Sequence, residues 1–318
     1  MAAALLFYGA GLLAASVLVW RRPTLAVYAF VVGLAAHNAV MAGLYWLGVR
    51  GSALTLVQAW KEVLLAVALA RVVRDAVVAR RLPFEPHAVD GFAAAFGVLV
   101  VLYAVVPQSW LGGDADAKTV LYGARHDGTC VAAYALGRSV VLPPLRTLVL
   151  WVAGAVAALG IVEVYAVPIE WWRDADVPQY FGRQLGFDFH GPARLPENFV
   201  FNTGDEDELL RRMVSTFLSP LASAYMLVVA LCLWAARPRA RAPLAAAAFV
   251  GLLFTFTRAA LLVLACALLV FAAVRRVRWP LAGAAVVVVV AIAWTQLYPS
   301  VAPETHWFPA DQIGRAHV

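Results

Sequence analysis

The stretch LAAAAFVGLLFTFTRAALLVLACALLVFAAV, Leu244–Val274, decides the structural class of this chain. Two apolar runs, each barely long enough to cross a membrane, flank a short segment in which Arg258 is the single charge. An unpaired guanidinium in hydrocarbon costs roughly 2.5 to 3.5 kcal/mol on insertion scales. Arg258 is therefore predicted where water or an anion reaches it, either at a turn between two membrane helices or in a site that holds a negative ligand.

Composition places the rest of the chain in the same class. Of its 318 residues 63% are hydrophobic and 14% are charged, whereas soluble domains carry about 25% charged residues. Apolar runs near the length of a transmembrane helix recur along the chain, and they are solid runs rather than the alternation of a membrane β-barrel. We predict an all-α, polytopic transmembrane helical bundle. The net charge of +6 comes mostly from arginines at helix ends, so no nucleic-acid partner is expected.

Apolar runs predict ten spans and their flanking arginines predict the orientation. Arginines follow spans one, three, five, seven and nine, and these loops are therefore predicted to be cytoplasmic. The intervening loops are predicted to be exoplasmic, including the long loop 168–212, the turn at Arg258, and a second large loop that begins at 298. The predicted spans are 3–20, 24–47, 54–73, 90–106, 121–142, 147–167, 217–236, 243–256, 259–274 and 279–297.

The segment Pro168–Arg212 is the long polar loop of the sequence. It mixes acidic residues and arginines with Trp171, Trp172, Tyr180 and Phe181. One interpretation is a solvated loop whose tryptophans anchor at the headgroup level of the membrane. The other is a platform for a saccharide, because aromatic faces next to carboxylates suit sugar rings.

Several ionisable residues lie inside predicted spans, among them Lys61, Glu62, Arg125, Arg138 and Glu163. Such charges usually face the interior of a bundle, where they pair between helices or mark a substrate path. Both alternatives stay open here. Nucleotide-binding loops and metal-binding motifs are absent from the sequence, and its three cysteines have no metal-site spacing. No metal or cofactor is predicted.

Two short motifs resemble a known family. Arg212–Leu221, RMVSTFLSPL, resembles the pattern Arg-x-x-Gly-Thr-Phe-x-x-Pro-Asn of the O-antigen ligase and polymerase superfamily, with Ser215 in place of the glycine and Leu221 in place of the asparagine. Thr255–Ala260, TFTRAA, resembles the second pattern of that family, Thr-x-Ser-Arg-Gly-Ala. Further similar segments are Trp60-Lys61, Tyr122–Arg125 and Tyr134–Arg138.

The resemblance implies a GT-C-like bundle in a bacterial cytoplasmic (inner) membrane. It implies a metal-independent transferase that takes a glycan from undecaprenyl diphosphate on the exoplasmic face and moves it to a saccharide or lipid A-core acceptor. Whether the enzyme is a ligase or a polymerase stays open. Arginine suits a diphosphate leaving group because it stays charged and makes bidentate contacts. We predict Arg212 and Arg258 as catalytic residues, and Arg125, Arg138 and Arg211 as substrate-binding residues.

The family's general base, a histidine, is expected beyond position 312. The last six residues, Ile313–Val318, correspond to a translated sequencing-adapter oligonucleotide, so we predict a transmembrane domain over 1–312 that is C-terminally incomplete and a non-native tail over 313–318. Neither His306 nor His317 is predicted as the base, and residues 1–318 alone are predicted to lack transfer activity. Two alternatives stay open: a transporter or flippase of a lipid-linked or anionic substrate, and a bicarbonate-type accessory protein that shares the family signature.

Overall fold

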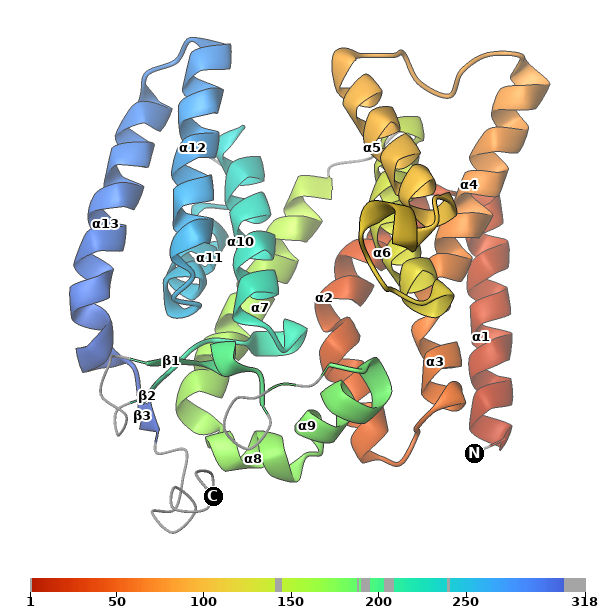
Figure 1. Ribbon diagram of the computed structural model, residues 1–318. Coiled ribbons are helices and arrows are strands. Elements are labelled where there is room, and N and C mark those ends of the chain that lie inside the picture. Colours follow the sequence, from red (N-terminus) through yellow and green to blue (C-terminus); the bar gives the residue numbers. More distant parts are fainter. Residues whose placement is uncertain are drawn as a thin grey trace. The chain divides into compact units, whose positions relative to one another are not determined.

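A computed structural model describes residues 2–140, 145–187, 189, 195–202, 209–238 and 241–305 (Figure 1). These described residues are mainly helical, which confirms the predicted all-α class, and they include one small sheet. It divides into two compact units. Unit 1 comprises Met1–Phe30 and Thr55–Pro143, and unit 2 comprises Val31–Leu54 and Pro144–Val318.

Unit 1 packs its first helix against the helices that follow the junction with unit 2. Val19 of α1 and Phe30 of α2 are buried in one cluster with Leu65 of α4 and Leu136 of α6. The N-terminus of α6 is capped by Asp116, whose carboxylate accepts a hydrogen bond from the Thr119 N–H at 2.8 Å. The elements of unit 1 are α1 (Ala2–Arg21), α4 (Trp60–Ala79), α5 (Ala88–Val105), η1 (Gln108–Leu111) and α6 (Ala117–Ser139), while α2 (Thr24–Trp46) and α3 (Ser52–Gln58) each contain residues of both units.

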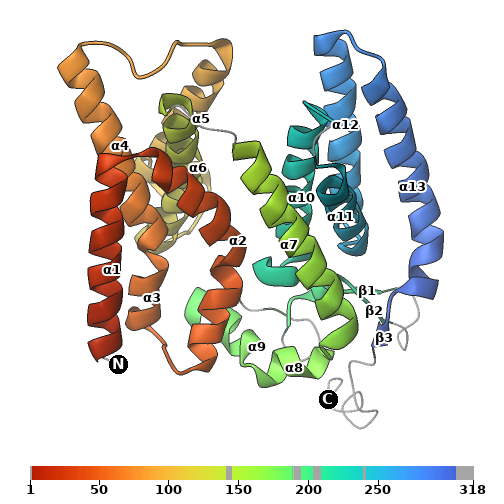
Figure 2. The same cartoon turned by 180° about the vertical axis from the view of Figure 1, so that it is seen from behind.

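Unit 2 is a bundle in which successive helices run in alternating directions (Figures 1 and 2). Its elements are α7 (Leu145–Ala166), α8 (Ile169–Asp174), α9 (Val177–Gln179), η2 (Tyr180–Leu185), η4 (Glu197–Phe199), β1 (Val200–Asn202), β2 (Leu209–Arg211), η5 (Ser215–Phe217), α10 (Pro220–Ala235), α11 (Ala242–Phe254), α12 (Arg258–Arg275), α13 (Trp279–Val301) and β3 (Glu304–Thr305). α11 approaches α7 closely, because a side chain on Gly251 would lie 2.6 Å from Cβ of Ala157. Small residues of this kind allow membrane helices to pack tightly.

Among the described residues, five helices are long and apolar enough to cross a membrane: Thr24–Trp46, Ala88–Val105, Leu145–Ala166, Arg258–Arg275 and Trp279–Val301. Shorter apolar helices occupy Leu5–Arg21, Pro220–Ala235 and Ala242–Phe254, and each coincides with a predicted span. The predicted span 54–73 overlaps α3 and α4, and the predicted span 121–142 overlaps α6, which ends at Ser139; α4 and α6 carry more charged residues than the five helices above. The span 54–73 is interrupted at Ala59, between α3 and α4. A membrane domain is thus supported, while the ten-span topology remains a prediction.

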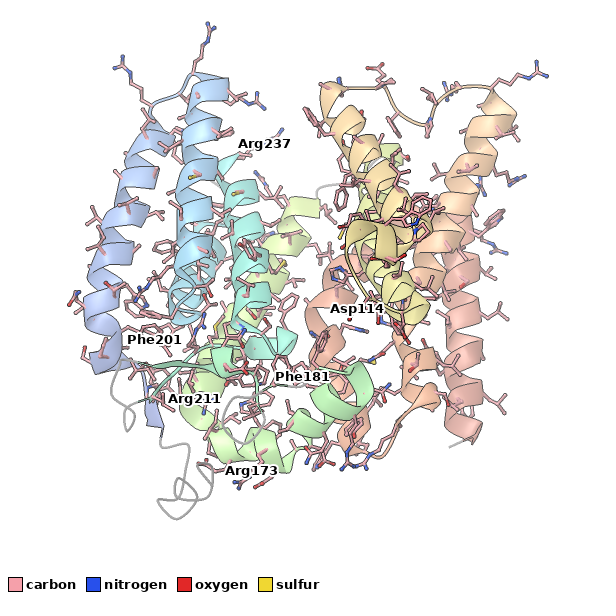
Figure 3. The ribbon with its side chains drawn as sticks, viewed as in Figure 1. Asp114, Arg173, Phe181, Phe201, Arg211 and Arg237 are labelled. Carbon is pink, nitrogen blue, oxygen red and sulfur yellow. The ribbon has the colours of Figure 1, made fainter. Side chains whose placement is uncertain are left out.

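The two ends of unit 2 differ in composition. The sheet, α8 and α9 lie at one end, together with the turn between α11 and α12 (Figures 1 and 2). The junctions α10–α11 and α12–α13 lie at the other end, and Arg237 marks it in Figure 3. The arginines of those junctions in the described part of the chain are Arg237, Arg241, Arg275, Arg276 and Arg278. The sheet end also carries arginines, among them Arg173, Arg211 and Arg258, but there they stand together with acidic residues such as Glu170 and Asp174. The orientation of the loops therefore stays a prediction.

The described part of the loop 168–212 makes specific contacts and contains buried side chains. Arg50 forms an ion pair with Asp176 at 2.9 Å, which fastens the loop to the segment after α2. Trp172, Tyr180 and Phe181 are buried, and Trp171 is 48% exposed. These four aromatic side chains therefore do not form the saccharide platform that the sequence left open, because three of them build the core of the loop. Within this loop, residues 188, 190–194 and 203–208 lie outside the described part.

Candidate functional site

The turn between α11 and α12 forms the centre of the candidate site. Thr255 and Thr257 are buried, and Phe256 adopts a left-handed backbone conformation with φ of 48°. This conformation is uncommon for a bulky residue and needs support from its surroundings. Tyr298 of α13 gives part of that support, because its ring stacks on Phe256 with a centroid distance of 4.4 Å.

Arg212 holds this turn from the other side. It follows directly on the central strand, and its backbone N–H donates to the Phe199 carbonyl at 3.0 Å. Its guanidinium donates to the Thr255 carbonyl at 2.9 Å and to the Thr257 hydroxyl at 3.0 Å. Burial lowers the pKa of the Arg212 guanidinium. Arg212 thus brings one cation to the turn that immediately precedes Arg258.

Arg258 is the first residue of α12 and is exposed. Its guanidinium carbon lies 5.4 Å from the ring centroids of both Phe201 and Phe256. The two rings are themselves 4.5 Å apart, so they form an aromatic seat beneath the cation. The N-terminus of a helix carries a partial positive charge, which repels the Arg258 cation. The guanidinium and the helix N-terminus together therefore attract an anion. The Arg258 guanidinium therefore contacts the two aromatic rings and is still accessible from solvent.

The side chain of Arg211 is buried inside the protein. Its guanidinium donates to the Glu163 carboxylate at 2.7 Å and to the Val167 carbonyl at 2.9 Å. The side chains of Arg211 and Glu163 are only 4% and 8% exposed. Figure 3 places Arg211 at the sheet, near the lower end of unit 2 in that view. The predicted substrate contact of Arg211 thus lacks an exposed guanidinium, and we treat the residue as structural.

The second oxygen of Glu163 supports the segment after Arg212. It accepts hydrogen bonds from the backbone N–H groups of Val214 at 3.2 Å and Ser215 at 3.4 Å. Ser215 has φ of 50°, the left-handed region that glycine adopts without strain. A side chain on Gly160 would meet Met213 Sδ at 2.4 Å, so α7 needs a glycine where this segment crosses it.

The predicted residues of unit 1 are engaged in ion pairs. Arg125 of α6 donates twice to Glu62 of α4, at 2.9 and 2.6 Å, so these two charges pair between helices. Arg138 pairs with Asp90 at 2.9 Å, next to the Tyr134 hydroxyl, which donates to the same carboxylate at 2.6 Å. Their predicted roles in substrate binding stay open. In unit 2, Arg212 and Arg258 meet at the turn between α11 and α12, whereas Arg211 is buried against Glu163.

Sequence reasoning missed the supporting residues Phe201 and Tyr298, and it identified Glu163 without its partners. The Tyr298 hydroxyl donates to the carbonyls of Arg211, the last residue of β2, and Phe254, the last residue of α11. Tyr298 thereby connects the sheet to the end of α11. An aromatic residue near the end of a span gives no signal for such a role. His306, His317 and the segment Ile313–Val318 lie outside the described residues. Within the described ranges, no group of three or more His, Cys, Asp or Glu is placed to hold a metal ion.

Comparison of the chain with protein-family models, with curated proteins and with solved structures gave no match. The case for a function therefore rests on the geometry at Arg212 and Arg258 and on the motifs that contain them.

Proposed function

We propose that this protein takes part in metal-independent glycosyl transfer from undecaprenyl diphosphate at the exoplasmic face of a bacterial cytoplasmic membrane. The observation that carries the proposal is the convergence of Arg212 and Arg258 on one turn. The two residues are 46 positions apart in sequence, and each lies in one of the two family-like motifs. A diphosphate leaving group needs permanent cations where no metal is used, and arginine supplies them.

The geometry suggests a division of labour between the two arginines. Arg258 has an exposed guanidinium on an aromatic seat, so it is the residue that would contact the diphosphate. Arg212 donates three hydrogen bonds within the turn, to Thr255, Phe256 and Thr257. Arg212 would hold the turn that positions Arg258, and its buried charge would add positive electrostatic potential at the site. In the terms used for enzymes, Arg258 would be catalytic and Arg212 mainly a positioning residue.

The reaction can be written with these roles. An acceptor hydroxyl oxygen attacks the anomeric carbon of the donor sugar, and the bond from that carbon to the diphosphate oxygen breaks. The electron pair leaves with undecaprenyl diphosphate, whose developing charge Arg258 would stabilise. The hydroxyl proton must pass to a general base, and no residue of the described ranges is assigned that role.

The family-like motif has one further feature in its favour. The resembled pattern has glycine at the position of Ser215, and Ser215 adopts a backbone conformation that glycine favours, with φ of 50°. This agreement between a motif position and a backbone angle supports the resemblance.

The test is transfer by the gene product in membranes supplied with an undecaprenyl-diphosphate glycan and an acceptor. Arg258→Ala should abolish transfer, and Arg258→Lys should restore little, because lysine lacks the planar fork. Arg275→Ala, at the other end of the same helix, is the matched control. Lipid-linked glycan should accumulate outside the membrane. Accumulation inside would instead indicate a flippase, and normal transfer by Arg258→Ala would overturn the proposal.

A further inference from the structure

A groove runs between α12 and α13, with a volume of about 520 Å³. Figure 1 shows these two helices side by side in unit 2. The groove is lined by Arg258 at one end and by Leu262, Val288 and Ile292 further along. This combination of a cation and aliphatic side chains suits a ligand with a charged head and an apolar chain. The groove is open to the outside of the bundle, because Leu262 and Ile292 are 63% and 64% exposed.

Polarity changes along the groove in one direction. Arg258, Thr295 and Gln296 line the end near the candidate site. From Gln296 back to Val287 the groove follows α13 for about 13 Å, given 1.5 Å per helical residue. Over that distance its floor is formed by buried Leu261 and Val287, and its rim by exposed aliphatic residues.

Both helices are among those apolar and long enough to cross a membrane. The apolar part of the groove then lies beside hydrocarbon, and its cationic end lies at the interface. A ligand that fits has an anionic head and an unbranched or methyl-branched apolar chain.

We infer that the α12–α13 groove binds the first isoprene units of a polyprenyl diphosphate, with the diphosphate at Arg258. The inference rests on the proposed function and adds the surface that receives the lipid chain. Charge complementarity selects this occupant over a neutral lipid, because Arg258 is exposed at the mouth and Arg212 reinforces the positive potential there. Such a groove would also orient the diphosphate relative to the turn, since the chain and head are covalently joined.

The experiment measures affinity of the full 318-residue chain in nanodiscs for three probes: undecaprenyl diphosphate, undecaprenol and inorganic diphosphate. The rim variants Leu262→Trp and Ile292→Trp place a bulky side chain across the groove. They should weaken undecaprenyl diphosphate binding about tenfold or more, because displacing even two buried methylene groups has about that effect. They should also weaken undecaprenol binding and leave inorganic diphosphate unaffected.

The matched control is Val289→Trp, because Val289 follows Val288 directly, is 65% exposed and does not line the groove. It should bind all three probes like the wild type. Arg258→Ala should lose both diphosphates and keep undecaprenol. Phosphatidylglycerol is included as a competitor, and equal competition by it would show an ordinary lipid site and overturn the inference.

Two outcomes separate this inference from the proposed function. If the rim variants bind undecaprenyl diphosphate normally while Arg258→Ala does not, the groove assignment is wrong and the proposed function stands. If the wild type binds neither diphosphate, the proposed function itself fails. Should both tryptophan variants misfold, a photoreactive undecaprenyl diphosphate bound to the wild type decides the matter: cross-links to α12 and α13 support the groove, and cross-links elsewhere exclude it.

Discussion

Breaking the buried ion pair between Glu163 and Arg211 should destabilise unit 2 and loosen the candidate site. Glu163 binds the Arg211 guanidinium at 2.7 Å with one oxygen and the N–H groups of Val214 and Ser215 with the other. Glu163→Leu removes all three contacts. Removal of one partner of a buried pair costs roughly 3 to 5 kcal/mol, because the other charge is left uncompensated.

The double variant Glu163→Leu/Arg211→Met separates the two contributions. It leaves no unpaired charge, so it should recover most of the loss that the ion pair causes. The N–H groups of Val214 and Ser215 still lack an acceptor, which costs about 1 to 3 kcal/mol each. We therefore expect the double variant to be more stable than Glu163→Leu and less stable than the wild type.

The assay is the free energy of unfolding in mixed detergent micelles, followed by tryptophan fluorescence. Glu170→Gln is the control, because Glu170 is exposed in α8 and its change should stay within about 0.5 kcal/mol. The reasoning is refuted if the double variant is no more stable than the single one, or if Glu163→Leu unfolds like the control.

Three further predictions follow from the same structure. Gly160→Val should lower the melting temperature and weaken diphosphate binding because its side chain would collide with Met213, whereas Gly137→Ala, which has open space, should change neither; equal effects of the two would contradict the packing argument. Arg212→Lys should bind diphosphate less well as pH rises toward the usual lysine pKa of about 10.4, because burial at this position lowers the pKa of a cation and the lysine loses its charge. The affinity of the wild type should stay constant over the same range, and parallel pH titrations of the two proteins check this. Asn202→Cys should react with an impermeant thiol reagent added outside cells and Ala240→Cys should not, in a background without native cysteines, and the reverse pattern would invert the predicted topology.

The helices could be predicted from sequence because membrane spans are continuous apolar runs of nearly fixed length. The span 54–73 shows the limit of that rule, since α3 ends at Gln58 and α4 begins at Trp60. The sheet could not be predicted. β1 and β2 are three residues each, and β3, which pairs with β2, follows α13 in the sequence. No local sequence pattern therefore marks these strands.

The candidate site was predictable in its arginines and not in their surroundings. Arg212 and Arg258 stand out because short motifs contain them. The pairing of Glu163 with Arg211 joins positions 48 residues apart, and neighbouring Arg212 takes a different direction. Sequence alone does not say which of two adjacent arginines turns inward. That choice depends on strand geometry, since successive side chains along an extended segment point to opposite sides.

The most direct test of the central claim is contact between Arg258 and a lipid diphosphate. Solid-state NMR of the chain with ¹⁵N-labelled arginine and bound undecaprenyl diphosphate measures dipolar dephasing of guanidinium ¹⁵N by ³¹P. We predict clear dephasing in the wild type and in Arg275→Ala, and loss of most of it in Arg258→Ala. Dephasing in Arg258→Ala equal to that in Arg275→Ala would show that the diphosphate binds elsewhere, and would contradict the account.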